Sequence, residues 1–273
     1  MNTSVVISLI ATSFIACAAD TGTPTSETTG TTSQCIVNGD VVTVDNIGTP
    51  ILNLQVNQAN GGGWYICSST QLTDTLLLTA HHCATNESVP TGGTAIDPSN
   101  MYAQQFVPGN SGDKGSPFTV KTIYLHPTYD VAIIELVNPM LDYNGGHHNT
   151  PIYSGASADL IGQTVYCQGW GSNARGTDED PPGAGVLRSA YVTAGPTTSS
   201  GYSIYPNACG QIPWRGDSGS ACLIMDRLFG KLSITGVNSW GWSTDDAVIE
   251  SDLIGSEYIR DWVNAIISGD YDY

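Results

Sequence analysis

Residues 216–220 read Gly-Asp-Ser-Gly-Ser, so glycines stand on both sides of Ser218. Glycine lets a backbone turn tightly and brings its N–H groups close to a reacting carbonyl, as a nucleophilic serine requires. The pentad also fits the nucleophile elbow of α/β-hydrolases, whose catalytic histidine follows the serine in the chain. All five histidines of this sequence (81, 82, 126, 147 and 148) precede Ser218, which excludes that fold.

Three further segments accompany the pentad. Residues 78–83 (LTAHHC) carry two adjacent histidines, residues 129–134 (YDVAII) place an aspartate before an apolar run, and residues 239–241 (SWG) follow the serine. In this order the four segments closely resemble the motifs of chymotrypsin-like serine proteases, and the resemblance extends from Ile36 to the C-terminal helix. It implies an all-β fold of two six-stranded antiparallel Greek-key barrels followed by a C-terminal α-helix.

The resemblance assigns catalytic roles to named residues. Ser218 corresponds to the nucleophile, His82 to the general base and acid, and Asp130 to the carboxylate that orients the imidazole. The N–H groups of Gly216 and Ser218 correspond to the oxyanion hole, and Ser239 to a serine that hydrogen-bonds the aspartate. His81 competes with His82, but the family's histidine stands immediately before the cysteine, which selects His82.

No metal and no organic cofactor is implied. His126, which precedes a proline, and the adjacent His147 and His148 are interpreted as turn or surface residues. Adjacent histidines chelate zinc poorly without further ligands at suitable spacing. Trp170 is interpreted as a core residue without a chemical role.

The seven cysteines include no CxxC pair, which favours disulfides in an oxidising compartment over a zinc site. The resemblance implies a Cys67–Cys83 disulfide. The family also pairs a cysteine that precedes Gly-Trp-Gly with one that follows the active serine. Cys167 lies two residues later than the first of these positions, and Cys222 two residues earlier than the second. In an antiparallel ladder these opposite shifts keep the two residues opposite each other, so a Cys167–Cys222 disulfide is expected. Cys35 and Cys209 are then left to pair, although Cys209 could pair differently or stay free.

Activation and specificity follow the family only in part. Residues 36–39 (IVNG) resemble the N-terminus that zymogen cleavage creates, whose ammonium would pair with Asp217. The preceding residue is Cys35, neither Lys nor Arg, so another protease could cut here or the chain could fold competently uncut.

The resemblance places Ile212 at the floor of the specificity pocket, and an apolar floor disfavours Lys or Arg substrates. Ser239, Trp240 and Gly241 would form a wall of this pocket. Arg215 could favour acidic side chains, while Asp245 and Asp246 could add negative charge. For each of these three residues, a solvated loop charge is the preferred interpretation.

The N-terminal region is interpreted as a targeting signal followed by a tether. Residues 5–16 are apolar or small and too few to span a bilayer. Ordinary secretion with cleavage near Ala18 fits this segment, and so does a bacterial lipobox that lipidates Cys17. Residues 20–35 are mostly Thr, Ser, Gly and Pro, a composition that cannot bury enough apolar surface to fold.

Three parts are therefore expected. Residues 1–19 form the secretory or lipoprotein signal, residues 20–35 a flexible tether or propeptide, and residues 36–273 the protease domain. Within it, barrel one covers about 36–146, barrel two about 147–255 and the closing helix about 256–268. Apolar runs such as 75–79 (TLLLT) and 131–137 (VAIIELV) predict strands, and the apolar spacing after Ser256 predicts a helix that this serine can cap.

Charge excludes some partners. With 25 acidic against 8 basic residues the net charge is −17, so nucleic acid and anionic membrane surfaces should repel the chain. A membrane is expected only through a lipid on Cys17. Together these features predict a monomeric serine endopeptidase outside the cell, with proteins, peptides and protein inhibitors as partners. A binding protein that keeps the protease fold without turnover, or an esterase with the same triad, is the alternative.

Overall fold

The structure is a computed structural model of the whole chain. It describes residues 36–42, 51–58, 63–87, 89–105, 115–141, 147, 149–172, 184–227, 230–243 and 248–271. Cys17, Cys35, His148, Asp245 and Asp246 lie outside these residues, as do the predicted signal and tether. No helix within the described ranges is long and apolar enough to cross a membrane.

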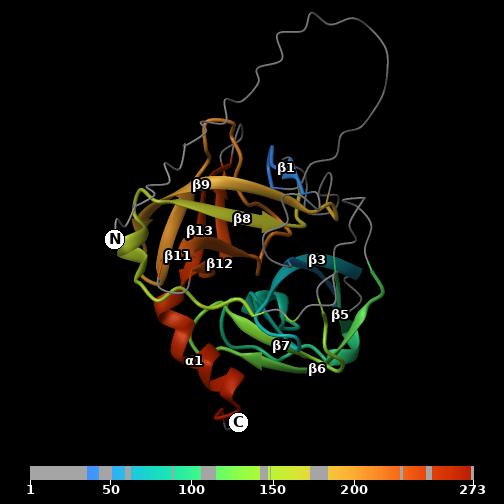
Figure 1. Cartoon of the computed structure of the whole chain (residues 1–273). Helices are drawn as coiled ribbons and strands as arrows, with labels where there is room; N and C mark the ends of the chain where they lie inside the picture. Colours follow the sequence, from blue (N-terminus) through green and yellow to red (C-terminus); the bar gives the residue numbers. More distant parts are fainter. Residues whose placement is uncertain are drawn as a thin grey trace, which may run out of the picture. The chain divides into compact units, whose positions relative to one another are not determined.

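The first half of the domain is a closed six-stranded antiparallel barrel with the strand order β2-β3-β4-β7-β6-β5 (Figure 1). Its strands are β2 (Ile51–Gln58), β3 (Gly63–Gln71), β4 (Leu76–Thr79), β5 (Met101–Gln104), β6 (Phe118–Leu125) and β7 (Ala132–Leu136).

The second half is a closed six-stranded barrel as well, because β9 pairs with β8 at one end of the sheet and with β10 on its other side. Its strands are β8 (Thr164–Gly169), β9 (Arg188–Thr197), β10 (Gly201–Tyr205), β11 (Ala221–Asp226), β12 (Lys231–Ser243) and β13 (Val248–Gly255). Counted from its first strand, each barrel follows the order 1-2-3-6-5-4, so the predicted two-barrel fold is confirmed.

One strand departs from the expected division of the chain. β1 (Asp40–Val41) falls in the range predicted for the first barrel, but it pairs with Ser189 and Arg188 of β9 in the second. Val37 extends this contact by exchanging two backbone hydrogen bonds with Ile212. The segment before the first barrel is therefore held by the second one.

Strands β4 and β7 are apolar on both faces because both faces are buried. Leu77 and Ile134 point into the core of the first barrel. Leu78 and Ile133 point the other way, into a cluster shared with Leu223 of the second barrel. Alternate side chains of a strand face opposite sides, so the continuous apolar runs in the sequence identify the strands at which the two barrels pack.

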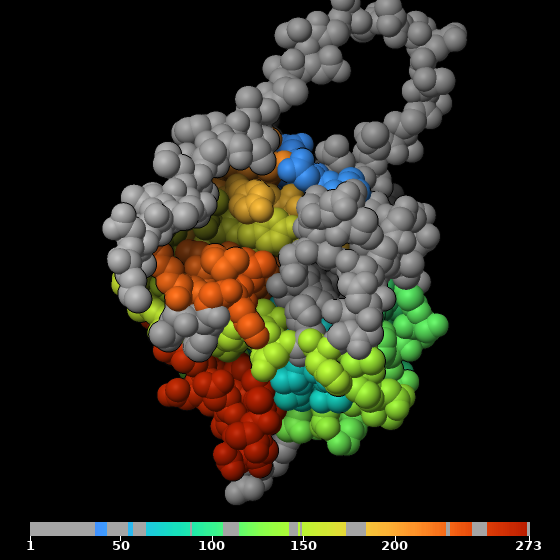
Figure 2. Space-filling view, in the orientation of Figure 1, coloured from blue at the N-terminus to red at the C-terminus, as the bar shows by residue number. Residues whose placement is uncertain are grey.

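The C-terminal helix α1 (Ser256–Ser268) belongs to the same shared cluster, through Ile259, Val263 and Ile266. In Figure 2 it forms the red surface beside the teal and green residues of the first barrel. Because the cluster contains residues of both barrels, the helix covers the apolar seam between them.

The predicted cap of this helix is wrong. Ser256 is the first helical residue, its hydroxyl has no hydrogen-bond partner among the described residues, and Gly255 occupies the N-cap position without a side-chain cap. Gly255 is also the last residue of β13, so the strand continues directly into the helix and leaves no separate capping residue. Glu257 instead accepts hydrogen bonds from the backbone and hydroxyl of Ser157.

Two of the predicted disulfides are present. Cys67–Cys83 joins β3 to the 3-10 helix η1 (His81–Cys83), and Cys167–Cys222 joins β8 to β11, where the two residues are direct antiparallel partners. Cys209 is disulfide-bonded, but the proposed partner Cys35 lies outside the described residues.

The turn between β6 and β7 is built on His126. Its Nδ1 accepts hydrogen bonds from the backbone N–H groups of Thr128 and Tyr129 at 3.1 and 3.0 Å, and its ring packs against Trp262 of α1. His126 is thus a turn residue, as expected, but a buried one. Burial, with a smaller contribution from the charge of His81, lowers the pKa of His126 to about 4.

This histidine should make the protein sensitive to acid. Between pH 6.5 and 4 the unfolded chain binds a proton at this residue that the folded chain does not bind, so stability falls as pH falls. The loss amounts to about 3 kcal/mol across this range. Asparagine keeps a hydrogen-bond acceptor but does not titrate, so His126→Asn should remove this part of the pH dependence. Chemical unfolding at several pH values measures it, and identical slopes in both proteins would contradict the assignment.

Candidate active site

Strand pairing brings His82 and Asp130 together. Thr79, the last residue of β4, is paired with Ala132, the first residue of β7, so the residues just after β4 lie beside those just before β7. Asp130 accepts hydrogen bonds from the His82 ring at Nδ1 (2.8 Å) and from the His82 backbone N–H (2.9 Å). Both main chain and side chain of His82 are therefore held by one carboxylate.

Ser239 reaches the same carboxylate from the second barrel. Its hydroxyl donates to Asp130 Oδ2 at 2.5 Å, and Asp130 is only 3% exposed. Since a carboxylate is an acceptor, the His82 proton facing it sits on Nδ1. Nε2 is then the nitrogen left to act as a base.

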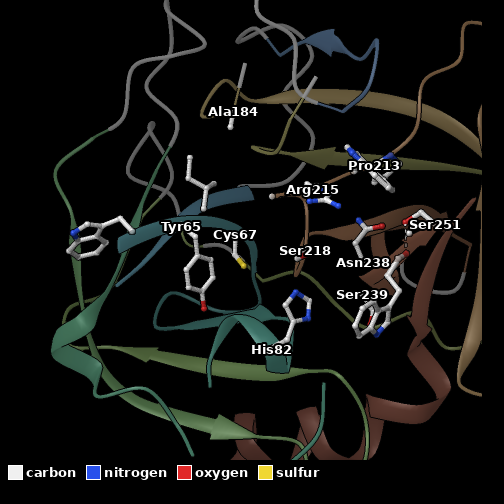
Figure 3. Close-up of a pocket in the computed structure, with 16 residues that line it drawn as sticks. Tyr65, Cys67, His82, Ala184, Pro213, Arg215, Ser218, Asn238, Ser239 and Ser251 are labelled. Carbon is white, nitrogen blue, oxygen red and sulfur yellow. Dashed lines mark hydrogen bonds between the residues drawn. The ribbon is translucent and has the colours of Figure 1, made fainter. Parts of the chain in front are cut away.

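Ser218 and His82 line one pocket of about 900 Å³, and Figure 3 shows Ser218 above the His82 ring. No hydrogen bond joins the serine hydroxyl to the ring among the described residues. Such bonds are often long in a free enzyme and tighten when substrate binds.

Two residues that line the same pocket have backbone N–H groups without an acceptor in the described part of the chain. The N–H groups of Gly216 and Ser218 have no acceptor among the described residues, while the Arg215 carbonyl accepts from the Ser172 N–H at 2.6 Å. A peptide plane turns its C=O and N–H in opposite directions, so this bond aims the Gly216 N–H away from Ser172. Gly216 has a φ of +89°, in the region that only glycine adopts readily.

Ser68 of β3 holds this loop from the opposite barrel, a role that the sequence did not reveal. Its N–H donates to the Ser218 carbonyl at 2.9 Å and its hydroxyl to the Gly216 carbonyl at 2.9 Å. The same hydroxyl accepts from the Trp170 N–H at 3.0 Å. A serine after a cysteine is no motif, so only the folded structure identifies it.

A protein-family model identifies the family of this chain. The family model described as Trypsin matches residues 36–263. The chain belongs to the trypsin family. No curated protein matches the sequence. The matched range includes both barrels and most of α1, and thus every trypsin-family motif on which the sequence analysis relied.

Most residues expected at the specificity pocket lie along one pocket. Ser239, Trp240, Gly241 and Arg215 line it, together with Pro213 and Trp214. Ile212 is not among the lining residues; it is fully buried, and its backbone is bonded to Val37. Its expected place at the pocket floor stays a prediction.

The residues of the predicted activation pair are both buried. Ile36 packs in the core of the second barrel, and Asp217 is fully buried. The Asp217 carboxylate accepts from the backbone N–H groups of Gly171 and Trp214, each at 2.8 Å. No ion pair involves Asp217 among the described residues, and in an uncut chain the Ile36 nitrogen is an uncharged amide.

Burial raises the pKa of Asp217 to about 7 in this uncut state. The two backbone N–H groups and the positive charge of Arg188 act against this shift without cancelling it. The positive charge around Asp217 is therefore too small to offset the cost of burying its ionised carboxylate.

Neither His81 nor His147 contributes to this site. His81 is buried and donates from Nε2 to the Gly92 carbonyl at 2.6 Å, and the exposed His147 pairs with Asp74. Cys67, His82 and Cys83 come within 4.8 Å of one another, but both sulfurs belong to one disulfide and offer no thiolate to a metal.

Replacing Ser68 with alanine should destabilise the protein. The variant removes the hydroxyl that accepts from the buried Trp170 N–H and donates to the Gly216 carbonyl, and loss of such buried bonds typically costs about 1–3 kcal/mol. The matched control is Ser69→Ala, because the Ser69 hydroxyl is also buried but has no partner among the described residues. Denaturant unfolding should separate the two variants. Equal stabilities would show that the Ser68 bonds contribute nothing.

Asp217 should give the uncut chain an unusual pH dependence. Its folded pKa lies above its unfolded value, so the folded chain retains a proton between pH 4 and 7, and the contribution of this residue to stability falls as pH rises. Three pH units correspond to about 4 kcal/mol, opposite in sign to the contribution of His126. Asp217→Asn removes this contribution, so the stability of the variant should rise more steeply with pH than that of wild type. Chemical unfolding at each pH measures the two slopes, and equal slopes would refute the assignment.

Proposed function

We propose that this trypsin-family protein is a serine endopeptidase that cleaves peptide bonds through an acyl-enzyme on Ser218. The observation that supports this best is the convergence of His82, Asp130 and Ser239 beside a serine whose loop presents two unpaired N–H groups. Proteolysis through such an arrangement needs no metal and no organic cofactor.

The proposed reaction begins with attack by the Ser218 hydroxyl on the scissile carbonyl. The hydroxyl proton moves to His82 Nε2, while Asp130 keeps Nδ1–H in place and stabilises the imidazolium that forms. The carbonyl oxygen, now negative, is positioned to accept from the N–H groups of Gly216 and Ser218. One such donor is typically worth about 3 kcal/mol of barrier.

In the second stage His82 returns the proton to the departing amine. Water then attacks the acyl-enzyme with His82 again acting as the base, and Ser218 is regenerated. The buried Asp130 carboxylate holds the ring through both proton transfers, because its bonds to the His82 N–H and the Ser239 hydroxyl prevent it from turning away.

Export and activation belong to the same proposal. Two disulfides are compatible with an oxidising compartment, so we place the protease outside the cell, secreted or held by a lipid on Cys17. Cleavage before Ile36 would create an ammonium close to the second-barrel core in which Ile36 is buried. That charge would compensate Asp217.

Reaction with an organophosphorus fluoride tests the chemistry directly. We expect one phosphoryl group per molecule on Ser218, none in Ser218→Ala, and unchanged labelling in Ser220→Ala, whose hydroxyl is buried. Asp130→Asn should slow labelling and peptide hydrolysis by about 10⁴-fold because it disturbs the histidine tautomer. Mass spectrometry reads the label and a fluorogenic peptide library the hydrolysis.

The alternatives give different results in the same experiment. A binding protein without turnover would neither be labelled nor cleave peptides. An esterase would be labelled and would hydrolyse small acyl esters but leave every peptide intact. Either result would refute the proposed endopeptidase.

A further inference from the structure

The pocket beside Ser218 has two facing walls in the second barrel. One wall is residues 213–216, which lead to the serine, and the other is residues 239–241 at the end of β12. The leaving amine takes its proton from His82 and therefore lies toward the first barrel. The side chain on the acyl side of the scissile bond must then enter between the two second-barrel walls.

Trp214 occupies the space between these walls. A β-carbon added to Gly241 would lie 2.8 Å from Cζ3 and 3.0 Å from Cε3 of Trp214, closer than such atoms approach one another. The six-membered ring of the indole therefore rests on the Gly241 backbone and spans the gap. Gly241 is required there because any side chain would collide with the ring.

Hydrogen bonds to Asp217 fix the main chain of Trp214, and a neighbouring cation contacts its ring. The Trp214 N–H donates to the buried Asp217 carboxylate at 2.8 Å, and the Trp214 carbonyl accepts from the Asp217 N–H at 2.9 Å. The Arg215 guanidinium carbon lies 5.7 Å from the ring centroid, within cation–π range. A bulky substrate side chain could enter only by displacing this ring.

We propose that Trp214 closes the acyl-side subsite and restricts the residue bound there to glycine, alanine or serine. This inference rests on the proposed endopeptidase activity and names its substrate class. A methyl or hydroxymethyl group fits against the edge of the ring, whereas a leucine or phenylalanine side chain would overlap it, and crowding of a packed site is unfavourable.

The test compares wild type, Trp214→Gly and Trp214→Phe on peptides that differ only in the acyl-side residue. Wild type should cleave after alanine at least ~10-fold better than after phenylalanine, as expected for discrimination by pocket size. Trp214→Gly should reverse this order, and Trp214→Phe should lie between. The matched control is Trp64→Ala, which removes a ring from the first-barrel side of the pocket and should leave the acyl-side preference unchanged.

A binding measurement keeps the inference independent of catalysis. Free indole should bind to Trp214→Gly, where it refills the vacated space, and not to wild type, as measured by calorimetry or thermal shift. Wild-type preference for large acyl-side residues, or no indole binding by a folded Trp214→Gly protein, would overturn the inference. Absence of both fluoride labelling and cleavage, with indole binding retained, would count against the proposed function alone.

Discussion

The loop that carries the candidate nucleophile is anchored in the opposite barrel. Ser68 of β3 binds the carbonyls of both Gly216 and Ser218, and Thr70 of the same strand accepts from the Ala221 N–H. His82 follows β4, which is paired directly with β3. The distance from Ser218 to His82 is thus set by a short path of hydrogen bonds across the seam, and a shift between the barrels would separate the two residues.

Asp217 is the second anchor, and several features of the site share it. Its carboxylate and backbone hold Trp214 on one side, and its carboxylate binds Gly171 on the other. The pocket wall and the oxyanion loop are therefore coupled through one buried group. Residues that share a hydrogen-bond network do not act additively. Changes in charge at Asp217 should consequently alter both substrate fit and the position of the Gly216 N–H.

The sequence was informative where the chemistry demands particular residues at particular places. The order of His82, Asp130 and Ser218 led to the two-barrel fold, and the opposite shifts of Cys167 and Cys222 led to their pairing. The errors and omissions concern residues whose environment is set by distant parts of the chain. Counting back from Ser218 led to Ile212, which is buried, and did not reveal that Pro213 and Trp214 line the pocket. Ser256 fitted the pattern of a cap, but β13 runs directly into the helix. Ser68 has no motif, since its partners lie more than a hundred residues away.

Helix α1 follows both barrels in the chain, yet its apolar side chains complete the cluster in which the barrels meet. Residues 1–255 alone would leave that cluster uncovered. Because α1 comes after both barrels in the chain, a nascent polypeptide exposes this apolar cluster to water until the helix emerges from the ribosome and covers it.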